Sequence, residues 1–201
     1  MRPTLVVFVK EPRLGRVKTR LARDIGAVEA AWWFRHQSAR LIARLGRDRR
    51  WRTVLAVTPD AEGMRSRVWP PLPRAPQGRG DLGRRMTRFL CAEPGTRVRP
   101  GPVAVIGSDL PELRAHHVAA AFRLLRRHDA VLGPATDGGY WLIGLGNRRA
   151  VPRDLLEGVR WSTEHALADT LARLRHLDVA LAATLRDVDT AEDLLGPRRT
   201  G

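Results

Sequence analysis

The residues best suited to chemistry lie near the start of the chain, in the stretch FVKEPRLGRVKTRL over Phe8–Leu21. This stretch contains both lysines of a chain that has 36 lysines and arginines. An apolar run precedes it and a helical pattern follows, which predicts a strand, a loop carrying Gly15 and a helix start, an arrangement that receives phosphate. We predict that Lys10, Lys18 and Arg20 converge on a polyphosphate at the carboxyl edge of the strand. The alternative is a solvated basic turn.

Acidic residues follow two later apolar runs and could hold a metal ion. Asp109 comes after Ser108 at the end of one run, and Asp189 follows the other. A carboxylate at such a strand end projects into the same crevice and can bind Mg²⁺, or Mn²⁺, against phosphate oxygens. Asp109 could equally be a turn residue before Pro111. Mg²⁺ takes one or two carboxylates with phosphates and water, so the pair Asp109 and Asp189 would suffice.

Two glycine-rich segments are candidates for the rest of a ligand site. The segment 77–83 could approach a base or ribose with bare backbone, and it ends in a predicted helix N-cap at Asp81. The second segment, Asp137-Gly138-Gly139-Tyr140, would suit hydroxyl binding and ring stacking on an acceptor, to which we add Trp161. Each could instead be only structural, the first a flexible connection and the second a tight hairpin.

Alternating apolar strands and helical patterns must position these residues. Strands are expected at 4–9, 53–57, 102–107, 130–132, 140–145 and 179–185, and helices at 27–45, 82–91, 113–127 and 163–174. This alternation is typical of a parallel α/β sheet. The four prolines of 70–76 predict irregular structure there, and the aromatic run 32–34 is expected to lie in the core or at its edge.

Composition limits the classes of protein. With 201 residues and 43% hydrophobic residues, one globular domain over 1–201 is expected. No apolar run approaches the length of a membrane span, and one cysteine excludes an internal disulfide, so we expect a cytoplasmic protein. The net charge of +15 raises nucleic-acid binding. Because the arginines are scattered, without charge blocks or interleaved aromatics, we expect a nucleotide as the partner rather than a nucleic acid.

Six sequence blocks occur together in a fixed order, which is more specific than any one of them. They are FVKEPRLGRVKTRL, PQGRGDLGRRM, IGSDLPEL, GPATDGGYWLIGL, VRWSTEHALADT and DVDTAEDL. Over about Leu5–Leu195 they resemble a bacterial family with the GT-A fold, labelled glycosyltransferase-like or radical-SAM/selenodomain-associated transferases. The likeness to phospholactate guanylyltransferase and other nucleotidyltransferases is more distant. The resemblance implies a Rossmann-like three-layer sandwich around a mostly parallel mixed sheet.

The resemblance also implies roles for individual residues. By analogy with the nucleotidyltransferases, Lys18 and Arg20 would bind the triphosphate. Asp109 would bind the metal, with Asp189 as the second carboxylate. The residues near the base or ribose would be Gln77, Gly80 and Asp81.

Taken together, these features favour a Mg²⁺-dependent nucleotidyltransferase that acts on a small phosphate- or phosphonate-bearing acceptor. One alternative is a glycosyltransferase that uses an NDP-sugar, although such enzymes usually hold their metal through Asp-x-Asp and the segment 108–111 supplies one carboxylate only. Another is a nucleotide-binding subunit without chemistry. The sequence leaves the nucleobase, the acceptor and the oligomeric state open.

Overall fold

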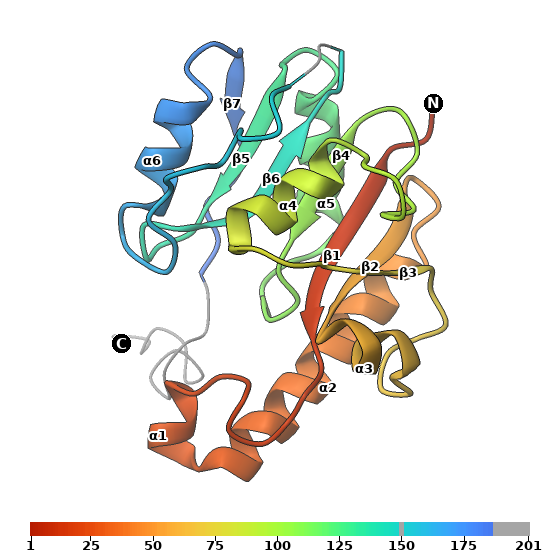
Figure 1. Ribbon diagram of the computed structural model, residues 1–201, viewed down its shortest axis with the longest axis vertical. Helices are drawn as coiled ribbons and strands as arrows, with labels where there is room; N and C mark the ends of the chain where they lie inside the picture. Colours follow the sequence, from red (N-terminus) through yellow and green to blue (C-terminus); the bar gives the residue numbers. More distant parts are fainter. Residues whose placement is uncertain (149–150, 187–201) are drawn as a thin grey trace, which may run out of the picture.

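A seven-stranded sheet forms the centre of the computed structural model, which describes residues 1–148 and 151–186 (Figure 1). The strand order is β3-β2-β1-β4-β6-β5-β7. Among the described strands β6 alone runs antiparallel to its neighbours. The strands are β1 (Thr4–Lys10), β2 (Arg52–Thr58), β3 (Arg74–Pro76), β4 (Val103–Ile106), β5 (Ala130–Pro134), β6 (Tyr140–Leu145) and β7 (Val179–Leu181).

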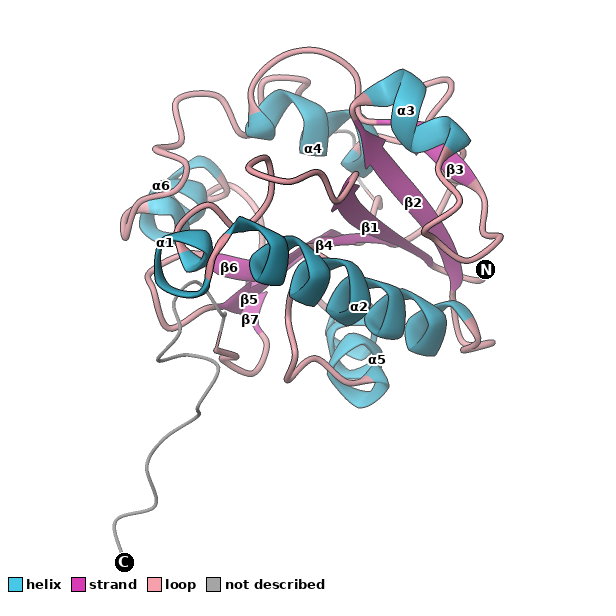
Figure 2. Cartoon of the chain, turned by 90° about the horizontal axis from the view of Figure 1, so that it is seen from below, coloured by secondary structure: helices cyan, strands magenta, loops and turns pink. Residues whose placement is uncertain are grey.

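Helices cover both faces of the sheet and make it the middle of three layers. They are α1 (Leu21–Ile25), α2 (Ala27–Gly46), α3 (Asp60–Arg65), α4 (Leu82–Leu90), α5 (Ala115–Leu124) and α6 (Ala166–Arg173). Figure 2 shows α2 and α5 on one side of the sheet and α4 on the other. The expected mostly parallel three-layer α/β sandwich is therefore confirmed.

Successive residues of β1 explain why both faces must be covered. Leu5 and Val7 pack in the core on the α2 and α5 side, whereas Val6 packs with α4 residues on the other side. All three side chains are fully buried. A strand buried on both faces shows a continuous apolar run instead of an alternating pattern, as the sequence of β1 does.

Two expectations about individual segments are wrong in part. The proline-rich segment contains β3, which pairs with β2 from the edge of the sheet, where a residue without an N–H group is tolerated. Arg74 stabilises it by donating to the carbonyl oxygens of Ser66 and Trp69. In the aromatic run, Phe34 is buried and Trp33 packs against the core, as expected. Trp32 is instead 62% exposed and stacks on His36, with ring centroids 4.1 Å apart, because it lies on the outer face of α2.

The order of the strands determines where a ligand can bind. From β1 the chain proceeds to β2 and β3 on one side, and then returns to β4 on the other. Such a switch point leaves a crevice beyond the carboxyl ends of the two central strands, because the connections leave in opposite directions. The loops after β1 and β4 meet at this crevice.

Candidate functional site

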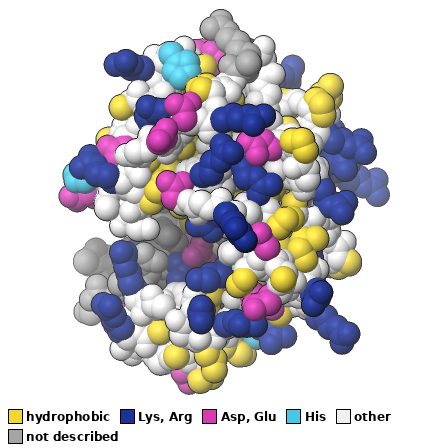
Figure 3. All heavy atoms as spheres, viewed as in Figure 1, with side chains coloured by type: hydrophobic (Ala, Val, Ile, Leu, Met, Phe, Trp, Pro, Cys, Tyr) yellow, Lys and Arg dark blue, Asp and Glu magenta, His cyan; other side chains and the backbone are white. Residues whose placement is uncertain are grey.

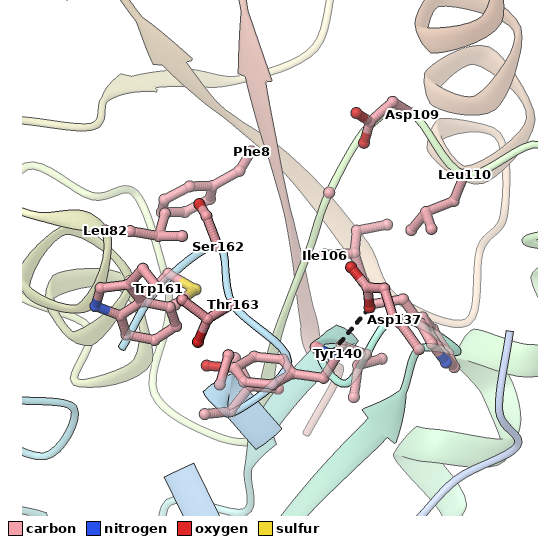
Figure 4. Close-up of a pocket in the computed structure, with 18 of the residues that line it drawn as sticks. Phe8, Leu82, Ile106, Asp109, Leu110, Asp137, Tyr140, Trp161, Ser162 and Thr163 are labelled. Carbon is pink, nitrogen blue, oxygen red and sulfur yellow. Dashed lines mark hydrogen bonds between the residues drawn. The ribbon is translucent and has the colours of Figure 1, made fainter. Parts of the chain in front are cut away.

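A cavity of about 970 Å³ lies beyond the carboxyl ends of β1 and β4, at the switch point of the sheet. The loop after β1, the start of α4, the end of β4, the turn before β6 and the segment 161–166 line it. Figure 4 shows Asp109, Leu110 and Asp137 on one side of this cavity, and Phe8, Leu82 and Trp161 on the other. Segments far apart in the sequence thus form one site.

An ion pair joins the first loop to the end of β4. The Nζ atom of Lys18 lies 2.7 Å from Oδ2 of Asp109, and the two side chains are 6% and 28% exposed. The flanking Val17 and Leu21 are buried, so the loop is anchored on both sides of the lysine. Lys18 itself has a left-handed backbone, with a φ of 44°, a conformation that a non-glycine residue adopts only where the surrounding structure imposes it.

The other predicted residues at the end of β1 and in the loop after it do not all reach the cavity. Arg20 lines the cavity with its neighbour Thr19. Lys10 and Gly15 are exposed and are not among the described lining residues. A Cβ atom on Gly15 would meet nothing within 4 Å, although its φ of +66° favours glycine. The structure therefore brings Lys18 and Arg20 to the cavity but not the other two.

Gln77 is buried and connects β2 to α4 through hydrogen bonds. Its Nε2 atom donates to the carbonyl oxygen of Ala56 at 2.9 Å, and its Oε1 atom accepts from Arg85 at 2.9 Å. Arg88 donates to the backbone oxygen of Gln77. Both ends of the carboxamide are thus engaged within the protein.

The remaining nucleotide-binding candidates also lie outside the described cavity lining. Asp81 is the N-cap of α4, as predicted, and accepts from the backbone N–H of Arg84 at 2.7 Å. Gly80 precedes it with a φ of +105°. Ser108 is buried, and its hydroxyl lies 3.4 Å from that of Ser38.

The residues predicted for the acceptor do come together at the cavity. Asp137 Oδ1 accepts from the N–H of Gly139 at 2.9 Å, which closes the turn between β5 and β6. Gly138 has a φ of +83°, and a Cβ atom there would lie 2.3 Å from the carbonyl oxygen of Glu164. The turn therefore packs directly on the backbone of the segment that carries Trp161.

Tyr140 and Trp161 form an aromatic pair at the cavity. Their ring centroids are 6.2 Å apart with an interplanar angle of 72°, an edge-to-face arrangement that aromatic pairs favour. Burial raises the pKa of the Tyr140 hydroxyl, against a smaller opposing effect of its hydrogen bond with Thr170, so the phenol stays neutral.

Sequence reasoning missed the residues that hold this aromatic pair in place. Asp169 on α6 accepts from the backbone N–H, Nε and Nη2 of Arg160 at 2.9–3.0 Å. These hydrogen bonds hold the pKa of the Asp169 carboxyl well below its usual range. Gly83 lets α4 approach, since a Cβ atom there would lie 2.9 Å from the Trp161 ring. The spacing of Arg160 and Asp169 carries no signal that distinguishes this pair from the chain's other arginines and acids.

The carboxylates among the described lining residues are those of Asp109, Asp137 and Glu164, and these could contribute oxygens to a divalent cation. Asp109 fits the role, because its partly exposed carboxylate faces the cavity and hard cations prefer such oxygens. Within the described residues no group of three or more histidine, cysteine, aspartate or glutamate side chains is placed to bind a metal. The second predicted ligand, Asp189, lies outside the described residues.

Two further observations concern the molecule as a whole. Figure 3 shows the lysine and arginine side chains dispersed over the face in view, with acidic side chains between them. No described helix has both the length and the apolar character that crossing a membrane would require.

Solved structures with the same fold place the chain in a class. A protein from Desulfovibrio desulfuricans G20, assigned provisionally to the nucleotide-diphospho-sugar transferases, is 30% identical. The alignment covers 99% of this chain and 87% of that one, with a TM-score of 0.86.

More distant structures share the fold. CMP:2-keto-3-deoxy-manno-octonic acid synthetase, complexed with CTP, is 10% identical over 97% of this chain and 96% of that one, at a TM-score of 0.56. Rv0371C from Mycobacterium tuberculosis H37Rv, in complex with manganese, is 17% identical over 97% and 96% of the two chains, at a TM-score of 0.53.

The fold and the D. desulfuricans relative define a member of the nucleotide-diphospho-sugar transferase superfamily, as the sequence blocks predict. Within it, the chain belongs to the family described as "Uncharacterized protein conserved in bacteria (DUF2064)", which it matches over residues 41–163. No protein of curated function matches the sequence.

Proposed function

We propose that this protein is a divalent-metal-dependent nucleotidyltransferase, which moves a nucleoside monophosphate from an NTP to a small acceptor bearing a phosphate or phosphonate. The observation that carries the proposal is the pair of Lys18 and Asp109 inside a large cavity at the switch point. An ammonium and a carboxylate side by side suit a ligand that combines a polyphosphate with a cation.

The reaction needs little from the protein beyond charge and position. An ionised oxygen of the acceptor forms a bond to the α-phosphorus, while the bond from that phosphorus to the oxygen bridging to the β-phosphorus breaks. Pyrophosphate leaves with the electron pair. Lys18 and Arg20 stabilise the charge that develops on it. No general base is required, because the attacking oxygen is already ionised.

Mg²⁺ or Mn²⁺, when bound, would supply further charge neutralisation at the phosphates. Asp109 is the proposed ligand, with Asp189 as the second carboxylate. Support comes from the oxygen donor of Asp109 at the cavity and from the fold neighbour that was crystallised with manganese. The neighbour that was crystallised with CTP supports a nucleoside triphosphate as a ligand of this fold.

Within this proposal the turn 137–140 and Trp161 face the acceptor. We also propose that a further set of residues lies near the nucleotide, although none of them is among the described residues that line the cavity: Lys10, Gly15, Gln77, Gly80, Asp81 and Ser108. For Gln77 this contribution would be indirect, since its side chain is already bonded to Ala56 and Arg85.

The experiment is a test of pyrophosphate release. The full chain is incubated with each of the four ribonucleoside triphosphates, Mg²⁺ and a panel of phosphate-bearing acceptors. We expect pyrophosphate in proportion to a nucleotidylated product with one of the triphosphates. Asp109→Asn should lose turnover yet still bind nucleotide, which a non-catalytic nucleotide-binding subunit would not predict.

A glycosyltransferase that uses an NDP-sugar is the second candidate, favoured by the provisional assignment of the D. desulfuricans relative. The same incubation separates the two. Consumption of an NDP-sugar with release of NDP, and no pyrophosphate from any NTP, would contradict nucleotidyl transfer and support this alternative.

A further inference from the structure

The cavity has a charged side and an apolar side. Asp109, which is paired with the ammonium of Lys18, lies with Asp137 on one side in Figure 4, whereas Phe8, Leu82 and Trp161 lie together on the other. Glu164 and His165, which follow Trp161 in the chain, also line the cavity. Each of these three uncharged side chains comes from a different part of the chain, namely the end of β1, the first turn of α4 and the segment before α6. The division is therefore a property of the folded cavity and not of one loop.

Rigid packing holds the apolar side in place. Phe8 packs edge-to-face on Phe89, with ring centroids 5.4 Å apart. Trp161 is bounded by the Tyr140 ring, and the residue before it is tied to Asp169 by three hydrogen bonds. A preformed wall of this kind binds a flat or apolar group without paying to order its own side chains.

The side chains of Phe8, Leu82 and Trp161 carry no hydroxyl group, so the hydroxyls of a ligand would have to pair with neighbouring residues. Thr163 Oγ1 donates to the carbonyl oxygen of Arg160 at 2.8 Å and accepts from the N–H of His165 at 3.2 Å. The Tyr140 hydroxyl oxygen accepts from Thr170 Oγ1 at 3.4 Å, which leaves its own proton to donate. Ser162 carries a further hydroxyl beside this wall (Figure 4).

The few hydrogen-bonding groups beside the wall favour one class of acceptor over another. A sugar phosphate would bring several hydroxyl groups against the wall, and each one buried without a partner lowers affinity by about tenfold. An aromatic or branched apolar group needs no such partners and gains from leaving water.

We infer that the acceptor is a phosphomonoester of an aromatic or apolar alcohol, whose phosphate lies on the charged side and whose organic group lies between Phe8, Leu82 and Trp161. The inference rests on the proposed function for the presence of a phosphate-bearing acceptor. It goes beyond that function by naming the chemical class of the acceptor.

The test measures binding without turnover. Isothermal titration of the full chain, in phosphate-free buffer with Mg²⁺, compares phenyl phosphate with glucose 1-phosphate. We expect phenyl phosphate to bind at least about tenfold more tightly. Trp161→Ala should remove most of that preference, whereas Trp32→Ala, which removes an exposed tryptophan of α2, should keep it.

A second variant tests the wall independently, in case Trp161→Ala does not fold. Leu82→Asn changes a half-buried residue of the wall, and circular dichroism spectra of all variants establish that the fold is retained. The preference for phenyl phosphate should fall here too. Equal or tighter binding of glucose 1-phosphate by the wild type would overturn the inference.

Titrations with nucleotides test whether the wall binds the acceptor or the nucleobase. ATP, CTP, GTP and UTP are titrated into the same variants, and we expect their affinities to stay within about twofold of the wild type. If Trp161→Ala weakens NTP binding and leaves phenyl phosphate unchanged, the wall binds the nucleobase and the inference is wrong. Absence of pyrophosphate release, with the preference for phenyl phosphate intact, would instead overturn the proposed function alone.

Discussion

The ammonium of Lys18 and the carboxylate of Asp109 lie 2.7 Å apart at the carboxyl ends of two adjacent parallel strands. Because the lysine side chain is almost fully covered, its charge would be costly there without ionic and hydrogen-bonding partners. The pair therefore fixes one cation and one anion at the point of the sheet where a ligand can enter. This relationship underlies the first two predictions.

Replacing Lys18 by methionine should lower the rate of pyrophosphate release by about 10²–10³-fold, because one preorganised charge at the leaving group is lost. Lys18→Arg should restore only part of the activity, since the larger planar guanidinium does not fit a site shaped for an ammonium. Steady-state kinetics with the best NTP check this. Arg123→Met, on the exposed end of α5, is the matched control, and an equal loss there would contradict a specific role for Lys18.

Asp109→Asn should abolish the stabilisation that Mg²⁺ adds to a bound nucleotide. A ligand at 100 times its Kd adds about 2.7 kcal/mol to the free energy of unfolding. Thermal-shift curves with NTP, with and without Mg²⁺, measure the metal-dependent part. We expect it in the wild type and not in the variant. A full Mg²⁺ effect in the variant would remove Asp109 from the metal site.

The pair of Arg160 and Asp169 should position the Trp161 wall. Arg160→Ala frees the segment that carries Trp161, so the KM for the acceptor should rise while the KM for the nucleotide and kcat change little. Initial rates with each substrate varied in turn separate these effects. A drop confined to kcat would argue that the pair acts on the chemical step instead.

The same pair predicts a dependence of stability on pH. The pKa of the Asp169 carboxyl is depressed in the folded chain by its hydrogen bonds with Arg160, so the folded state favours the ionised form. Its stabilisation is complete above the unfolded pKa of about 4 and is lost as the pH falls towards the depressed value. In urea unfolding, Asp169→Asn should therefore cost more stability at pH 6 than at pH 3. An equal loss of stability at the two pH values would contradict this prediction.

Gly138→Ala should destabilise the protein by about 2 kcal/mol or more, because a Cβ atom would overlap the backbone of Glu164 and the left-handed φ adds strain. Gly158 is the matched control, since its φ of +77° is similar but nothing lies within 4 Å of its Cβ position. Gly158→Ala should cost only about 1 kcal/mol, from the backbone alone. Equal losses in urea unfolding would show that the contact with Glu164 is unimportant.

Local patterns in the sequence were enough to predict most of the strands, because a strand buried on both faces leaves a continuous apolar run wherever it lies. The N-cap at Asp81 and the turn at 137–139 were predictable for the same reason, as each depends on neighbours a few residues away. The edge strand β3 was not, since its prolines are tolerated only because no further strand pairs beyond it.

The sequence by itself determined the fold class, the basic loop and the carboxylate that follows a central strand. Only the tertiary structure decided that Lys18 rather than Lys10 meets Asp109. Lys10 ends β1, whereas Lys18 lies in the following loop, whose path depends on long-range packing of Val17 and Leu21. It also decided that Phe8, Leu82 and Trp161 share a wall. Contacts between residues so distant in the chain follow from strand order and layer packing, which no local pattern records.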